Sequence, residues 1–98
     1  MMGVGYALME QLMIADGKVV TANFGDYKIP TIRDVPKFNT SVTERAKGAG
    51  PYNSMPIGET SNIPAAAAIA NAVEDAVGVR INSLPITPEK VLTALRGA

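Results

Sequence analysis

The sequence predicts a small single domain of the α+β class, in which three helices pack with two or three short strands. Apolar residues recur at helical spacing in three stretches, and shorter stretches alternate or favour extended backbone. The length agrees, because 98 residues allow one small domain at most. A domain of this size buries only about 60–70% of the surface of its extended chain, so its stability margin is thin.

The first helix is expected over residues 2–14. It is apolar almost all round, which is typical of a helix that is buried on more than one side. Asp16-Gly17 then signals a tight turn. Residues 18–24 favour a strand, because β-branched and aromatic side chains recur there. One stripe of the helix is formed by Val4, Leu8 and Leu12.

A second strand and a long loop follow. Side chains alternate over residues 37–45, which predicts a half-exposed strand. Glycines and prolines forbid regular structure over much of residues 46–62. A loop of this length in so small a domain is usually either functional or disordered.

Residues 64–77 are expected to form an alanine-rich helix. Asn62 or Ser61 can cap its free amides, Pro64 suits its first turn, and Gly78 stands where a left-handed C-terminal cap belongs. The buried stripe should contain Ala66, Ile69, Ala70, Val73 and Val77, with Asn71, Glu74 and Asp75 near the opposite side.

The C-terminal residues predict a short strand and a third helix. Residues 79–81 are the strand candidate. Thr87-Pro88-Glu89 begins the helix with a cap, a first-turn proline and a carboxylate near the positive helix end. Gly97 ends it. The apolar face comprises Val91, Leu92 and Leu95.

Composition excludes several classes of function. Nine basic and nine acidic residues cancel, which leaves no electrostatic footprint for nucleic acid. Cysteine and histidine are absent, so a disulfide framework, a zinc site and a Ser-His-Asp triad are excluded within the chain. The apolar residues 1–15 are too short for a membrane span and lack a basic leader, which indicates a cytoplasmic protein.

Glu59 is the candidate catalytic residue, and it stands between Gly58 and Thr60 in a loop stiffened by Pro51 and Pro56. A solvated loop carboxylate is the simplest interpretation, because loops are normally polar and exposed. A general base is the alternative.

Other polar or glycine-containing positions have simpler interpretations. Gly3-x-Gly5 suggests a phosphate loop only weakly, because no strand precedes it and no third spaced glycine follows, so helix packing is favoured. Asp26-Tyr27 fits a buried polar pair or a loop anchor. Asp34 fits a turn or capping residue, and Asn71 fits a structural role that satisfies loop backbone.

Several blocks resemble one family in order and spacing. They are Gly3–Glu10, Asp26–Thr31, Asp34-Val35-Pro36, Ile57-Gly58-Glu59, Ala68–Gly78 and Leu84–Leu92. Together they resemble the C-terminal segment of the molybdenum-binding large subunit of the xanthine dehydrogenase/aldehyde oxidase family, the molybdenum hydroxylases. The resemblance implies that residues 1–98 are the C-terminal part of a molybdopterin-binding domain.

The resemblance also implies chemistry. Glu59 would be the catalytic base in the oxidation of N-heteroaromatic, purine-like or aldehyde carbons, with water as the oxygen source. Gly3, Gly5 and Gly58 would lie at the cofactor, and no residue here would ligate the metal. The full enzyme would use molybdopterin cytosine dinucleotide with molybdenum, and FAD and 2Fe-2S clusters on partner domains or subunits.

Three positions depart from the family pattern. Met55 stands where lysine is common, Pro56 where a small residue is usual, and Met2 where the family often has a cofactor-contacting glutamine. The isolated chain, without the remainder of the molybdenum subunit, is expected to be inactive. The alternative is a noncatalytic docking or self-associating module derived from this family, and a homo-oligomer is compatible with either interpretation. The substrate is not encoded in these residues.

Overall fold

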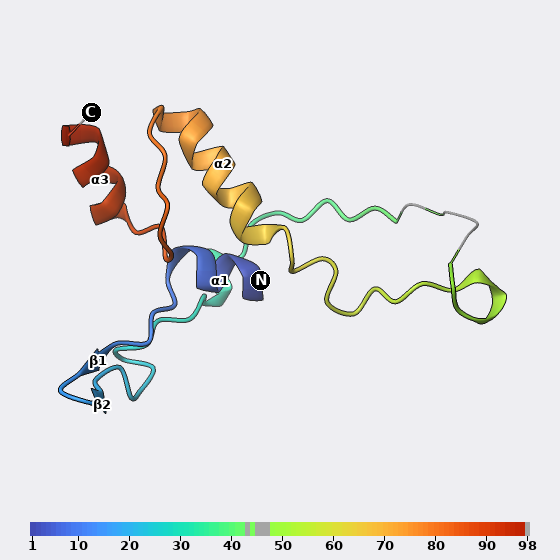
Figure 1. Ribbon diagram of the computed structural model, residues 1–98, viewed down its shortest axis with the longest axis horizontal. Helices are drawn as coiled ribbons and strands as arrows, with labels where there is room; N and C mark the ends of the chain where they lie inside the picture. The colour runs from blue at the N-terminus through green and yellow to red at the C-terminus, as the bar shows by residue number, and fades with distance from the viewer. Residues whose placement is uncertain (43, 45–47, 98) are drawn as a thin grey trace.

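The computed structural model describes residues 1–42, 44 and 48–97, and it confirms the small α+β fold. Within these residues the chain forms three helices and one two-stranded antiparallel sheet, joined by long irregular segments (Figure 1). The elements are α1 (Met2–Leu8), β1 (Ile14–Ala15), β2 (Lys18–Val19), α2 (Ala65–Val77) and α3 (Pro88–Gly97), with short 3₁₀ turns at Ile32–Asp34 and Pro51–Asn53.

The short helix α1 is the centre of the fold. α2 packs against it, and the amide of Ile86 donates to the carbonyl oxygen of Ala7 at 2.6 Å (Figure 1). Ala7 and Ile86 are the buried hydrophobic residues of the described chain. We call α1, the start of α2 and residues 84–87 the hub. The contacts on several sides of α1 agree with the expectation from its apolar sequence.

The prediction that the first helix continues to residue 14 is wrong. The amides of Met9 and Glu10 both bond to the carbonyl of Gly5 at 2.9 Å, and the chain leaves the helix there. Ile14–Ala15 instead pairs with Lys18–Val19 across Asp16-Gly17. Both turn residues have positive φ, 50° and 74°, which is the twist that a two-residue hairpin favours. Because of this turn, the last residue of the expected helix lies in a strand.

The three strand predictions also need correction. The strand expected over residues 18–24 ends at Val19, and Asn23 then closes a turn by accepting from the Gly25 amide at 2.7 Å. Residues 37–42 and 44 form no strand, and Thr43 and Arg45 lie outside the described residues. Residues 79–81 are irregular. Strand backbone needs a paired neighbour, and the described residues supply only the β1–β2 pair.

The predicted end of α2 is confirmed, and its predicted start is wrong. Gly78 adopts the left-handed conformation, with φ 75°, and its amide bonds to the Glu74 carbonyl. At the other end Pro64 is the N-cap residue, and no side chain caps the helix. The stripe predicted to be buried is only half-buried, whereas Asn71, Glu74 and Asp75 are exposed as expected.

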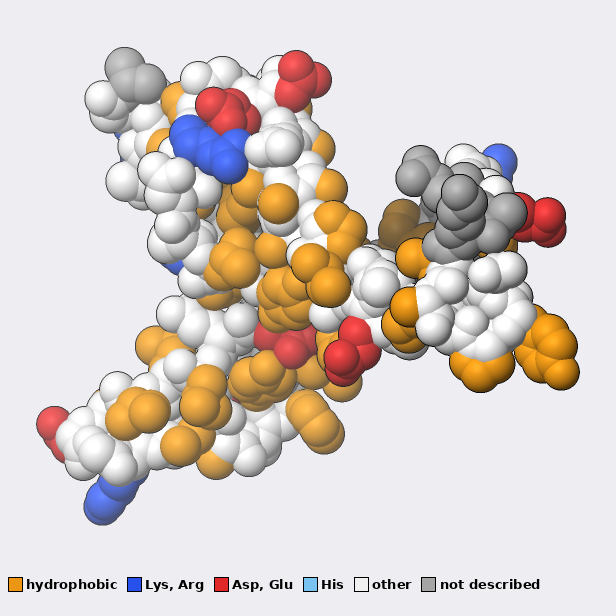
Figure 2. All heavy atoms as spheres, turned by 45° about the vertical axis from the view of Figure 1, so that its right-hand side comes forward, with side chains coloured by type: hydrophobic (Ala, Val, Ile, Leu, Met, Phe, Trp, Pro, Cys, Tyr) orange, Lys and Arg blue, Asp and Glu red, His pale blue; other side chains and the backbone are white. Residues whose placement is uncertain are grey.

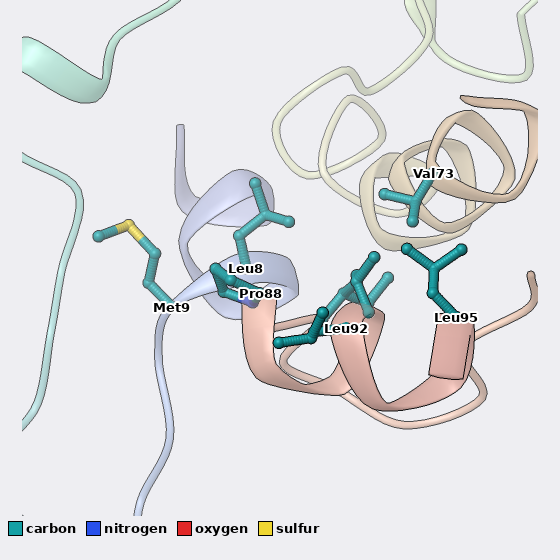
Figure 3. A pocket seen from close by; sticks show the side chains of 8 residues that line it. Leu8, Met9, Val73, Pro88, Leu92 and Leu95 are labelled. Atoms are coloured by element: carbon teal, nitrogen blue, oxygen red, sulfur yellow. The ribbon is translucent and has the colours of Figure 1, made fainter. Parts of the chain in front are cut away.

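The start of α3 matches its prediction. The Thr87 hydroxyl accepts from the Lys90 amide at 3.4 Å, and Pro88 begins the helix. Hydrogen bonds from its own backbone amide and from the Thr87 hydroxyl hold the pKa of the Glu89 carboxyl below its ordinary value. Leu92 and Leu95 face Val73 of α2 and Leu8 of α1 across an apolar groove of about 600 Å³ (Figure 3).

The chain is open. Its radius of gyration is 17.5 Å, whereas a compact domain of this length has about 13 Å. Its accessible surface is 8071 Å², against about 5,300 Å² for a compact protein of this mass. We call residues 37–62 the arm, because its described residues run far out from the helices before returning to α2 (Figure 1).

Large apolar side chains remain exposed in the hairpin region and in the arm, and Figure 2 shows apolar side chains over the helices and along both projections. The exposed set includes Leu12, Met13, Ile14, Phe24, Phe38, Val42, Tyr52, Met55 and Ile57. None of the helices in the described ranges could cross a lipid bilayer.

Candidate functional site

A pocket of about 370 Å³ lies where α1, the returning end of the arm and the start of α2 meet. Figure 1 shows that return passing beside the N-terminal end of α1. Gly3, Gly58 and Glu59 line the pocket although they are distant in sequence. The fourth predicted site residue, Gly5, is not among the lining residues. Other lining side chains include Phe38 and Asn62.

The two glycines of this pocket are glycine for different reasons. A Cβ on Gly3 would collide with the Cβ of Ala65 and would stand 2.8 Å from Oδ1 of Asn62. Gly3 therefore lets α1 and α2 approach closely, as helix packing predicts. No described atom lies within 4 Å of the place where a Cβ on Gly58 would stand, and its φ is not positive. Neither internal packing nor a left-handed turn requires glycine at this position.

Hydrogen bonds hold the backbone around Glu59, whereas its carboxylate is exposed. The Asn62 amide donates to the Glu59 carbonyl at 3.0 Å, and the Thr60 hydroxyl donates to the Ile57 carbonyl at 3.1 Å. The side chain is exposed, and no hydrogen bond or ion pair joins its carboxylate to another described residue. An open carboxylate on a fixed turn can accept a proton from a group bound in the pocket.

Tyr6 contributes to this site, and sequence reasoning did not single it out. Its hydroxyl donates to the carbonyl oxygen of Asn62 at 3.0 Å, in a partly buried position. The same carbonyl accepts from the Ala65 amide at 3.2 Å. Tyr6 therefore ties the end of the Glu59 turn to α1. The sequence held no signal for this bond, because an aromatic residue in an apolar helix is normally interpreted as packing.

Gly5 belongs to a second cluster on α1, away from the pocket lining. A Cβ there would collide with the Glu10 carboxylate and would stand 3.0 Å from Cδ of Pro30. The Tyr27 hydroxyl donates to Glu10 Oε2 at 2.8 Å, and this bond raises the pKa of the Tyr27 phenol above its ordinary value. Within this chain, Gly5 makes room for the loop that Glu10 and Tyr27 anchor.

The remaining polar candidates make local contacts. Asp26 accepts from the Asn23 amide side chain at 2.7 Å, so Asp26-Tyr27 is a loop anchor and not a mutual pair. Asp34 accepts from the amide and hydroxyl of Thr31, both at 2.7 Å, which confirms its capping role. Asn71 accepts from the Arg80 guanidinium at 2.6 Å, so it binds a side chain and not loop backbone.

The pocket suits a ligand that approaches the backbone closely. The space in front of Gly58 is open. The Glu59 carboxylate can accept a proton, and the side-chain amide of Asn62 can donate and accept hydrogen bonds. Met2 lines the same pocket, whereas Met55 and Pro56 line a separate hollow in the arm. The described residues contain no group of three or more acidic, histidine or cysteine side chains placed to hold a metal ion.

Comparison with known proteins gives the family. A family model described as a molybdopterin cofactor-binding domain matches residues 1–36. The chain is 42% identical over 92 residues to the xanthine dehydrogenase molybdenum-binding subunit of Escherichia coli, with 92% of this chain and 12% of that subunit covered. It is 38% identical over 99 residues to 6-hydroxypseudooxynicotine dehydrogenase complex subunit gamma of Paenarthrobacter nicotinovorans, with 97% and 12% covered.

The backbone is also similar to a solved structure. Quinoline 2-oxidoreductase from Pseudomonas putida superposes with a TM-score of 0.78 and 31% identity, over 96% of this chain and 13% of that one. The present chain spans only 12% of the length of each of the two sequence relatives. With the resemblance of its motifs now matched in both sequence and fold, the chain belongs to the xanthine dehydrogenase and aldehyde oxidase family of molybdenum-binding subunits.

Proposed function

We propose that these 98 residues form the C-terminal part of the molybdopterin-binding domain of a molybdenum hydroxylase, with Glu59 as the general base. The enzyme would oxidise carbons of N-heteroaromatic, purine-like rings or of aldehydes, with water as the oxygen source. One observation carries the proposal. Glu59 and Gly58 from the arm meet Gly3 of α1 at one pocket, and the relatives are molybdenum-binding or dehydrogenase subunits by name.

The residues of the pocket have distinct tasks in this proposal. When bound, the molybdenum cofactor supplies the electron acceptor and a Lewis acid. Glu59 accepts a proton at a carboxylate oxygen, which requires a donor atom within about 2.6–3.2 Å. Gly58 lets the bound group approach the backbone, because no Cβ stands in the open space before it. Gly3 lets α1 pack closely against α2 at the same pocket.

The departure at Met2 acts in this pocket. Met2 lines it where the resembled family often has a glutamine, and a thioether lacks the donors of an amide. We expect apolar contact to the cofactor, molybdopterin cytosine dinucleotide, at this position. Gly5 would act on the cofactor only indirectly, through the shape of α1.

Most of the proposed site must come from other polypeptide. The chain exposes about 2,700 Å² more surface than a compact protein of its mass, and one partner contributes about 800 Å² to an interface of standard size. We propose that the remainder of the molybdenum subunit covers the groove lined by Leu8, Val73 and Leu92, together with the arm. FAD and 2Fe-2S clusters on partner domains or subunits would carry electrons away, and the isolated chain would not turn over.

The test begins with a tagged pull-down from the native host, followed by assay of molybdenum, flavin and iron. The substitution Glu59→Gln should then lower turnover of the recovered complex by about 10²–10⁴-fold, while its molybdenum content and the stability of the chain stay unchanged. Glu44→Gln is the matched control, because Glu44 is an exposed carboxylate of the same arm. Turnover that survives Glu59→Gln contradicts the proposal.

A noncatalytic self-associating or docking module is the second candidate, and the exposed apolar groove between α1, α2 and α3 favours it (Figure 3). Recovery of the chain alone and free of molybdenum, as a concentration-dependent oligomer by sedimentation, would support this candidate. Glu59→Gln would then be silent, whereas Leu92→Asp in the groove would disperse the oligomer.

A further inference from the structure

We infer that Tyr6 is a positioning residue for Glu59: its hydroxyl clamps the turn that carries the carboxylate onto α1. The chain of contacts is short. The Tyr6 hydroxyl donates to the Asn62 carbonyl at 3.0 Å, and the Asn62 amide donates to the Glu59 carbonyl at 3.0 Å. The inference rests on the proposed function of Glu59 as the base.

The clamp matters because little else in the described chain holds this end of the arm. The carboxylate of Glu59 has no partner among the described residues, and its neighbours Ile57 and Ile63 are exposed. The side chain of Asn62 lies over Gly3, where any Cβ would meet it. The Tyr6 bond and this close contact together fix the turn beside the pocket.

The bond also connects the turn to α2. The Asn62 carbonyl accepts from both the Tyr6 hydroxyl and the Ala65 amide, at 3.0 and 3.2 Å. Pro64 provides no backbone donor and no side chain caps α2. The Asn62 carbonyl is therefore shared by α1, the turn and the first residue of α2. Loss of the tyrosine donor should release the turn while leaving the helix in place.

Amide hydrogen exchange in the 15N-labelled chain tests the clamp without any cofactor. Tyr6→Phe removes only the hydroxyl and should speed exchange of the Asn62 and Ala65 amides by about five- to tenfold. The Ile86 amide, which bonds to Ala7, should be unchanged and reports that the hub stays folded. Tyr27→Phe is the matched control, because Tyr27 also donates one hydroxyl bond from a partly buried position. Unchanged exchange at Asn62 in Tyr6→Phe, or an equal rise in Tyr27→Phe, would overturn the clamp.

Steady-state kinetics of the molybdenum-containing complex tests the positioning role. Tyr6→Phe should lower kcat about tenfold through misplacement of the base, with KM and molybdenum content equal to those of Tyr27→Phe. A parallel loss of molybdenum would show a structural role and overturn the inference. An inactive Glu59→Gln enzyme combined with a fully active Tyr6→Phe enzyme would overturn this inference alone. An active Glu59→Gln enzyme would overturn the proposed function and the positioning role together. Amide exchange in Tyr6→Phe would still test whether the Tyr6 hydroxyl fixes the turn.

Discussion

Two isoleucines show how differently the hub and the arm are held. Ile86 is 3% exposed, and its amide bonds to Ala7 of α1, whereas Ile57 in the arm is 69% exposed. Residues of the hub pack against one another and form hydrogen bonds within the chain. The arm carries apolar side chains, including Phe38 and Met55, that stay more than half exposed. The comparison shows that the candidate base lies on a segment that this chain buries much less than the hub.

The difference follows from where each segment finds its partners. α1 is contacted by α2, by residues 84–87 and by Pro30. Both ends of the arm reach the pocket at α1, through Phe38 at one end and Gly58 and Glu59 at the other, whereas its described middle residues run out from the helices (Figure 1). An apolar segment without contacts gains little from burial. We therefore expect the arm to depend on the remainder of the subunit and the hub to be partly self-sufficient.

Substitution of the two isoleucines should give the largest contrast. Ile86→Ala removes buried methyl groups beside Ala7 and should lower the free energy of unfolding by about 2–5 kcal/mol. Ile57→Ala changes an exposed position and should alter it by less than about 0.5 kcal/mol. Urea denaturation followed by helical circular dichroism measures both values.

In the assembled complex the two losses of unfolding free energy should become more similar. A partner that covers the arm would bury Ile57, so Ile57→Ala would then destabilise the protein as well. Equal losses in the two variants of the isolated chain would contradict the division into hub and arm. The conservative variant Ile86→Val is the internal control, with an expected loss of about 0.5–1.5 kcal/mol.

The two pocket glycines sharpen the comparison with a smaller effect. Gly3→Ala forces a methyl group against Ala65 and should destabilise the chain by about 1–3 kcal/mol. Gly58→Ala meets open space and should leave stability unchanged. In the molybdenum-containing complex the proposed function predicts that Gly58→Ala lowers cofactor content, because a Cβ would stand between the backbone and the bound group.

Thermal unfolding of the free chain and molybdenum analysis of the complex measure the two effects separately. A Gly58→Ala variant with full molybdenum content and full turnover would remove the argument for close approach at this position. Gly17 offers a control glycine, since it lies in open space but has a positive φ of 74°. Gly17→Ala should therefore destabilise only the hairpin.

Local signals in the sequence predicted the parts of the fold that depend on neighbouring residues. The Asp16-Gly17 turn, the left-handed Gly78 and the start of α3 at Pro88 are set by the conformations of one or a few residues. At residues 37–42 and 44 the expected strand is absent, because alternation indicates a surface to be covered and does not supply the neighbouring strand. The first helix was predicted too long because Leu12 continues its apolar stripe, whereas the residues that follow form the β1–β2 hairpin.

The candidate site divides in the same way. Gly3, Gly58 and Glu59 were predicted as site residues from the family resemblance of their blocks, whereas the apolar helix by itself indicated only packing for Gly3. The meeting of these segments depends on bonds between residues far apart in sequence, above all Tyr6 to Asn62. Gly5 lies only two residues from Gly3, but Glu10 and Pro30 occupy its side of the helix. No pattern along one chain could separate those two glycines.

Acid titration of Asp34, which lies just before the arm, should produce the smallest effect on stability. Hydrogen bonds from the hydroxyl and then the amide of Thr31 hold the pKa of the Asp34 carboxyl below its ordinary value. Because the pKa is lowered in the folded chain, the capping stabilisation is fully present above the unfolded pKa of about 4. It is lost as pH falls through the lower folded value.

Nuclear magnetic resonance can follow this transition at two amides. The Thr31 amide, which bonds to Asp34, should shift as pH falls below about 4, whereas the Ile86 amide, which bonds to Ala7, should not follow the same curve. Asp34→Asn should abolish the Thr31 transition and leave Ile86 unchanged. If both amides titrate together, the entry to the arm and the hub open as one unit, and the arm's separate dependence on a partner would lose its structural basis.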